Sequence, residues 1–239
     1  MISNFLSTSP QVIRKHFVVL FLICSISKAS EGLEPAHFGE ARQDFLQSLK
    51  LPILQEGEQL IIRCGSTVSP WGRILTTACY ETNGAITKSR EIGKALRRAL
   101  LGKRISPAKV DGKGVEIWFN FSLVYRRVKG APKLLLLENH AFRSSELTES
   151  YIAAQRFNTG SWGLFCKRTK KPIFAQVLVS ADGSLLGSKI SADDQPELCT
   201  ARILNAINQS RFIPAQMDGK PVNSTFIEIF YFSQLSQFR

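Results

Sequence analysis

Two stretches of this chain carry one pattern: residues 201–232, ARILNAINQSRFIPAQMDGKPVNSTFIEIFYF, and residues 95–125, ALRRALLGKRISPAKVDGKGVEIWFNFSLVY. Each stretch is typical of a helix end, a short exit, a Gly turn and a long apolar strand. Identical residues recur at an offset of 107 positions (211 − 104 = 107), namely Arg104, Pro107, Ala108, Asp111, Gly112, Lys113 and Val115 against Arg211, Pro214, Ala215, Asp218, Gly219, Lys220 and Val222. An internal repeat of this kind predicts two copies of one structural unit.

The residue types of the repeat explain its shape. Proline cannot continue a helix, so Pro107 and Pro214 end the two helices. The Asp-Gly pairs at 111–112 and 218–219 supply the positive φ of a tight turn. In the strands that follow, one face carries Phe119, Phe121, Leu123 and Tyr125 in the first copy, and Phe226, Phe230 and Phe232, interrupted by Glu228, in the second. The sequence leaves open whether the two strands differ by one residue in register, which would exchange their faces.

The helix, the pattern R-x-x-P-A-x-x-D-G-K-x-V and the apolar strand resemble the C-terminal domain of the TonB family. The two copies and their hairpins cover most of the chain beyond residue 30. The resemblance implies a periplasmic domain whose strand edge captures a segment of an outer-membrane protein. The Pro-rich span and the Ser-x-x-x-His motif of TonB proteins are missing, and Val12 stands four residues before His16. We therefore expect passive protein binding, with a membrane-anchored energy transducer and a scaffold with closed strand edges as alternatives.

The composition is that of a folded protein with a basic surface. Of 239 residues, 44% are hydrophobic and 21% are charged, and the net charge is +12. A basic surface attracts polyanions, but no aromatic-interleaved nucleic-acid motif accompanies these charges. We interpret them as a solvated basic face and expect no nucleic-acid partner.

Residues 1–29 are typical of a secretory signal. Arg14 and Lys15 precede the apolar run 17–26, and Ser27-Lys28-Ala29 places small residues at the cleavage site. A spanning helix needs about 20 apolar residues, and the run 17–26 is only half that length. We expect cleavage after Ala29 and a periplasmic protein; an uncleaved inner-membrane anchor, which would add membrane contact, is the alternative.

The remaining chain predicts an α+β fold of two tandem TonB-C-like α-β-β-α-β units, antiparallel sheets with helices on one face. The expected domains are residues 30–139 and 140–239. The expected helices cover residues 35–50, 88–103, 146–157 and 195–209. Hairpins are expected at 60–68 with 73–80 and at 173–180 with 184–190, and residues 134–137 fit either a short strand or a helix.

Four cysteines remain if Cys24 leaves with the signal, and an even count in an exported chain suggests disulfides. Cys64 and Cys79 are symmetric about the centre of the first hairpin at Trp71-Gly72, so we expect them to be bonded. Cys166 and Cys199 are left as the second pair. Buried free thiols are the alternative, and no spacing fits a metal or redox site.

No catalytic constellation stands out, so we expect no enzyme activity, cofactor or metal. His37 and His140 are interpreted as surface residues, and the Asp-Gly-Lys triplets as turns. The tryptophans are interpreted as core or hairpin-tip residues. We expect the last long strand to be the partner-binding edge, taking an envelope or outer-membrane protein segment by strand addition. Its residues are Thr225, Phe226, Ile227, Glu228, Ile229, Phe230, Tyr231 and Phe232.

Overall fold

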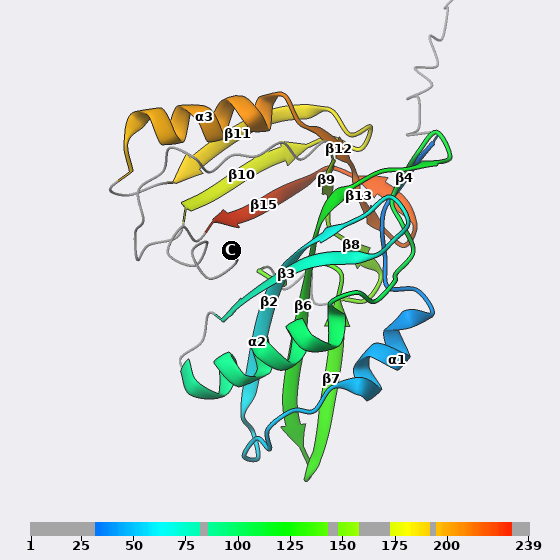
Figure 1. Cartoon of the computed structure of the whole chain (residues 1–239), viewed down its shortest axis with the longest axis vertical. Coiled ribbons are helices and arrows are strands. Elements are labelled where there is room, and N and C mark those ends of the chain that lie inside the picture. Colours follow the sequence, from blue (N-terminus) through cyan, green and yellow to red (C-terminus); the bar gives the residue numbers. More distant parts are fainter. Residues whose placement is uncertain (1–31, 82–85, 143–147, 158–172, 192–194, 231–239) are drawn as a thin grey trace, which may run out of the picture.

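The computed structural model describes residues 32–81, 86–142, 148–157, 173–191 and 195–230 (Figure 1). Within these residues the chain is an α+β fold of antiparallel sheets and three helices. The predicted signal at 1–29, Cys166, Tyr231 and Phe232 lie outside the described residues. No helix of the described part is long and apolar enough to cross a membrane.

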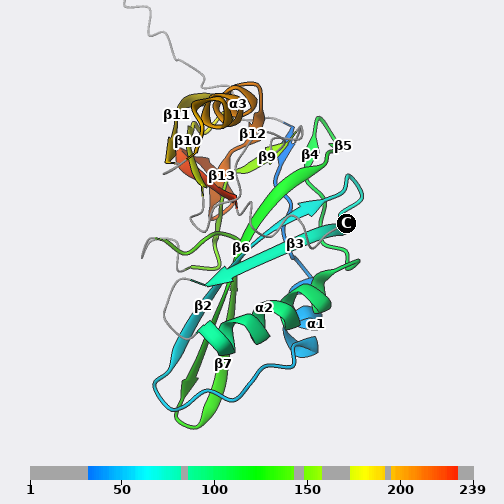
Figure 2. The same ribbon diagram turned by 60° about the vertical axis from the view of Figure 1, so that its left-hand side comes forward.

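The first sheet is built on a long central pair of strands, β2 and β6. Its main elements are α1 (Ala41–Ser48), β2 (Gln59–Val68), β3 (Ile74–Glu81), α2 (Ile86–Leu100), β6 (Ile117–Val128) and β7 (Ala131–Leu137). β2 pairs with β3 and β6, and β7 pairs with β6. Both helices lie on one side of this sheet (Figure 2), where Phe45 and Leu96 join Phe119 and Phe121 in one core. β7 is thus a strand, the first of the two interpretations that the sequence allowed.

The second sheet repeats this arrangement with fewer strands. It consists of β10 (Ile173–Val179), β11 (Leu185–Ser191) and β15 (Ser224–Phe230), with α3 (Glu197–Asn208) above it (Figure 1). β10 lies between β11 and β15, as β2 lies between β3 and β6. Ile203 and Ile207 of α3 pack with Val177 and Phe226.

The strand register is the same in both sheets. Gly65 pairs with Asn120 in the first sheet, and Gln176 pairs with Ile227 in the second (176 − 65 = 111 and 227 − 120 = 107). Each hairpin has a β-bulge at the matching step, Thr67/Val68 and Leu178/Val179. The register question that the sequence left open is therefore decided in favour of equal registers.

The repeated Pro and Asp-Gly motifs form two small sheets that the sequence analysis did not expect. Their strands are β1 (Leu33–Glu34), β4 (Lys109–Val110) and β5 (Lys113–Gly114) in one, and β8 (Tyr151–Ile152), β13 (Ala215–Met217) and β14 (Lys220–Val222) in the other. Asp111 and Asp218 both have φ 51°, and Gly112 and Gly219 follow with φ 74° and 73°. The positive φ that the Asp-Gly pairs predicted is confirmed at both turns.

The predicted helix at 146–157 is wrong for residues 148–157. These residues form β8 and β9 (Gln155–Phe157), and β9 pairs with both β6 and β12 (Arg211–Ile213). Strand β9 therefore extends the first sheet with residues from the second half of the chain. Residues 153–156 favour a helix by intrinsic propensity, but pairing of this segment with β6, β12 and β13 outweighs that preference.

Candidate functional site

The predicted binding strand β15 pairs with β10 alone among the described residues. Its side chains alternate: Ser224, Phe226 and Glu228 are buried, and Thr225, Ile227 and Ile229 are half-buried. One long edge of β15 therefore faces away from its own sheet. Tyr231 and Phe232, the end of the predicted binding segment, lie outside the described residues.

Two side chains from outside the second sheet contact that edge. The Asn120 amide donates to the Ile227 carbonyl oxygen at 2.9 Å, and His140 Nε2 lies 3.1 Å from the same oxygen. The Ile227 carbonyl thus points away from β10, so Ile227 and Gln176 are a pair without mutual backbone hydrogen bonds. Residues two apart share this orientation. The backbone groups of Ile229 therefore also point to the outer edge.

His140 is buried, so its interpretation as a surface residue is wrong. The residue is 5% exposed, and its carbonyl accepts a hydrogen bond from Arg63 Nε at 2.6 Å. The Arg63 guanidinium lies 4.4 Å from the ring centre of Phe142. Burial lowers the pKa of His140 to about 3. The hydrogen bond to the Ile227 carbonyl raises the pKa, and the nearby Arg63 charge lowers it further. The neutral ring can therefore donate through Nε2 to Ile227 without carrying a buried charge.

Beside this contact, Glu228 of β15 forms a buried ion pair with Arg156 of β9. Arg156 Nε and Nη2 donate to the two Glu228 oxygens at 2.9 and 3.0 Å, and the side chains are 2% and 4% exposed. Burial raises the pKa of the Glu228 carboxyl, and the Arg156 guanidinium opposes that rise. The pair ties β15 to the sheet that β9 extends.

Strand β6, which matches β15 in the first half, is an internal strand. β2 pairs along one side, while β7 and β9 pair along the other, with Trp118 opposite Arg156. Only the second of the two long strands therefore presents an edge within the described residues.

The predicted disulfide between Cys64 and Cys79 is confirmed. The two residues are directly opposite on β2 and β3, with Cα atoms 4.1 Å apart. Cys199 of α3 is also disulfide-bonded. Cys166, its expected partner, lies outside the described residues, so that pairing stays a prediction.

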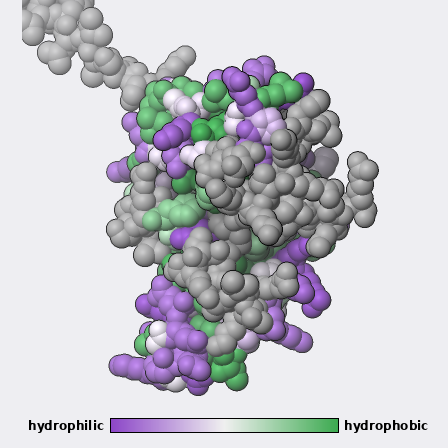
Figure 3. All heavy atoms as spheres, turned by 90° about the vertical axis from the view of Figure 1, so that its left-hand side faces the viewer, coloured by the Kyte–Doolittle hydropathy of each residue, from purple (hydrophilic) through white to green (hydrophobic). Residues whose placement is uncertain are grey.

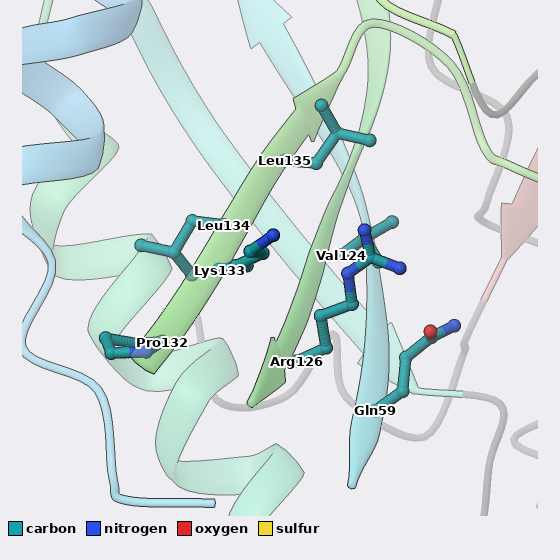
Figure 4. A pocket seen from close by; sticks show the side chains of 7 residues that line it. All are labelled: Gln59, Val124, Arg126, Pro132, Lys133, Leu134 and Leu135. Atoms are coloured by element: carbon teal, nitrogen blue, oxygen red, sulfur yellow. The ribbon is translucent and has the colours of Figure 1, made fainter. Parts of the chain in front are cut away.

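A groove on the first sheet is lined by residues of β2, β6 and β7. It has a volume of about 550 Å³, and its lining residues, all drawn in Figure 4, are Gln59, Val124, Arg126, Pro132, Lys133, Leu134 and Leu135. Arg126 and Lys133 are cross-strand partners. Within the described part of the chain, neither residue forms an ion pair with a carboxylate. A second groove of about 460 Å³ includes His37, Ser106, Ile152 and Gln216. The second groove places His37 beside Ser106, its partner in an isolated β-bridge, and no hydrogen bond between their side chains is found among the described residues.

On the face drawn in Figure 3, the coloured residues at the lower end of the molecule, which is built on the first sheet, are mainly hydrophilic. Among the described residues, no three His, Cys, Asp or Glu side chains lie close enough together to hold a metal ion.

Sequence reasoning placed β15 at the site but missed the residues that contact it from elsewhere. Asn120, His140 and Arg156 come from three separate segments of the chain, which only the fold brings together. One signal was present: Glu228 interrupts an apolar strand face. A carboxylate on such a face needs a buried cation or hydrogen-bond donors.

No family model matches this sequence, and comparisons with curated proteins and with solved structures found no match.

Proposed function

We propose that this chain is an exported, non-enzymatic protein of the cell envelope, built of two tandem TonB-C-like units, that binds an extended protein segment by strand addition at β15. The observation that carries the proposal is the outer edge of β15, which has no strand partner among the described residues. At that edge Ile229 directs its backbone amide and carbonyl away from β10. An incoming strand would take its affinity from these groups and its specificity from side chains on alternate positions.

The constant offsets of the strand pairings support two related units. Leu33 pairs with Val110 in one small sheet, and Tyr151 pairs with Met217 in the other. Tyr151 lies 118 positions after Leu33 (151 − 33 = 118), and Met217 lies 107 positions after Val110 (217 − 110 = 107). The Asp111 amide donates to the Gly32 carbonyl, and the Asp218 amide donates to the Ser150 carbonyl, at the same two offsets. Backbone contacts that recur residue by residue are what a duplicated unit would give.

One observation favours a second candidate, a structural scaffold. Asn120 and His140 already occupy the Ile227 carbonyl, and β6 is paired on both sides. If the residues beyond Ile229 are covered in the same way, β15 offers no free edge. The protein would then act through its overall surface rather than through a strand.

Proline substitution separates the two candidates, because proline removes the amide that an added strand would use. Ile229→Pro removes an outward amide of β15. Ser188→Pro is the matched control. The backbone groups of Gln176 point away from β15 and toward Lys189 of β11, so Lys189 points back toward β10. Ser188, which precedes Lys189, therefore points its backbone groups to the opposite outer edge of the same sheet. The readouts are circular dichroism and photo-cross-linking in intact envelopes from a probe at position 225, compared with a probe at the exposed Leu186.

Strand addition predicts a cross-linked adduct at position 225 that Ile229→Pro abolishes and Ser188→Pro preserves, with both spectra unchanged. Unchanged cross-linking in a folded Ile229→Pro protein would contradict strand addition at this edge. Loss of the folded spectrum in Ile229→Pro would show that β15 is internal and would favour the scaffold.

Export has its own test. N-terminal sequencing of the protein from the envelope fraction should begin at Ser30, directly after the proposed cleavage site. A protein that begins at Met1 in the inner-membrane fraction would contradict cleavage.

A further inference from the structure

An exposed strip of apolar and basic side chains is formed by the turn between β2 and β3, the start of β3 and the segment after α2, away from the proposed binding strand. Gly72 and Ile74 are buried, so the residues that alternate with them face outward. The exposed apolar members are Trp71 (77%), Leu75 (42%) and Leu101 (54%). The exposed basic members are Arg73, Lys103 and Arg104. These six residues are called the Trp71 strip.

Backbone contacts hold the two halves of the Trp71 strip together. Arg73 and Arg104 are partners in an isolated β-bridge. The Ile74 amide donates to the Lys103 carbonyl at 2.9 Å, and the Ile105 amide donates to the Gly72 carbonyl at 2.9 Å. Arg73 and Arg104 are therefore direct cross-strand neighbours, and Lys103 lies next to Arg104 in the chain.

This arrangement is unfavourable for the isolated protein. Like charges that face each other across paired strands reduce stability. In the described part of the chain, no ion pair joins Arg73, Lys103 or Arg104 to a carboxylate. By contrast Arg211, at the position equivalent to Arg104 (211 − 104 = 107), lies over the Phe157 ring at 5.2 Å. The nearby segment 113–116, which packs against Pro70, adds one charge of each sign and leaves the strip basic.

We propose that the Trp71 strip docks on an anionic lipid bilayer. Tryptophan and leucine insert at the boundary between headgroups and acyl chains, while lysine and arginine beside them meet anionic headgroups. Neither of the two grooves described above includes a residue of the strip. An exposed turn with basic residues beside it can meet a flat bilayer surface without a groove. The docking is independent of strand addition at β15.

The test uses the full chain with vesicles of neutral lipid and vesicles that contain about one third anionic lipid, both with brominated acyl chains. Brominated chains quench tryptophan only on contact. Because the apolar run 17–26 can bind either vesicle, each variant is compared with wild type in the same chain. The variants are Trp71→Phe and Arg73→Ser/Arg104→Ser, with Arg126→Ser/Lys133→Ser as the control for charge and Ile53→Ser (78% exposed) as the control for apolar exposure.

We expect anionic vesicles to quench the tryptophan fluorescence of wild type. In Trp71→Phe the quenching should be smaller, because the contribution of Trp71 is lost. Arg73→Ser/Arg104→Ser should weaken the charge-dependent binding by on the order of tenfold or more, since each basic residue near an anionic surface contributes about fivefold. Both controls should bind closer to wild type than this pair does. Equal quenching in wild type and Trp71→Phe would overturn the proposal. Equal loss in Arg73→Ser/Arg104→Ser and in Arg126→Ser/Lys133→Ser would do the same. Tight binding of soluble polyglutamate without a preference for bilayers would also overturn the proposal.

Discussion

Arg156 and Glu228 form a buried two-bond ion pair at the positions that Phe38 and Phe121 hold in the first half of the chain (156 − 38 = 118 and 228 − 121 = 107). Phe38 and Phe121 meet edge to face, with ring centres 5.5 Å apart. In the tandem arrangement proposed above, these two contacts occupy equivalent positions. The second half has a charged contact there, and the first half has an apolar one.

This comparison predicts the outcome of exchanging the pair. Arg156→Met or Glu228→Gln alone leaves a buried group without its partner and should cost about 3–5 kcal/mol of unfolding free energy. Arg156→Phe/Glu228→Phe installs the residues of the first half and should lie close to wild type, because replacing a buried ion pair by packed apolar residues is often neutral. Urea denaturation measures all three. A double variant as unstable as the single ones would contradict the equivalence of the two positions.

His140 makes stability depend on pH. Its pKa is lowered to about 3 in the folded protein by burial, against 6.5 for an ordinary histidine. The unfolded chain therefore binds this proton first, so stability present at pH 7 is lost as the pH falls through 6.5 toward 3. Between pH 7 and 4.5 this amounts to about 2–3 kcal/mol. His140→Gln should show a shallower loss over this range in urea titrations; parallel curves for the two proteins would contradict the assignment.

Gly65 is required by the Trp118 ring on the neighbouring strand. A Cβ at Gly65 would lie 2.4 Å from Trp118 Cζ2, closer than side chains approach in real proteins. Gly65→Ala should cost roughly 1–3 kcal/mol through overpacking. Gly187→Ala on β11 is the matched strand control, because a Cβ there meets nothing within 4 Å. Thermal unfolding of both variants tests this, and equal melting temperatures would count against the Trp118 contact.

The parts of the fold that the sequence predicted are those with local causes. The two main hairpins, α2 and α3 follow from apolar periodicity, and the Asp-Gly turns follow from the φ that glycine allows. The disulfide between Cys64 and Cys79 followed from hairpin symmetry alone. Each of these features depends on residues close together in the sequence.

The parts that the sequence missed depend on pairing between distant segments. Residues 151–157 carry spacing that suits a helix or a strand, and the edges of β6, β12 and β13 decide for a strand. His140 gave no local sign of burial, because Arg63 is 77 positions away and Ile227 is 87 positions away. Glu228 was visible as an exception on an apolar face, but nothing local identified Arg156 as its partner.

The disulfides are expected to stabilise the protein because they lower the conformational entropy of the unfolded chain. Cys64 and Cys79 are 15 positions apart in the sequence, and closure of a loop of that length contributes about 3 kcal/mol. Cys64→Ala/Cys79→Ala should lower the free energy of unfolding by about this amount, with some loss of packing because Gly93 of α2 lies against Cys79. Peptide mapping without reduction should recover Cys64 joined to Cys79 and Cys199 joined to Cys166. A Cys199 peptide joined to any other cysteine would contradict the second pairing. A Cys64→Ala/Cys79→Ala protein with wild-type stability would show that the hairpin is held by its backbone ladder alone.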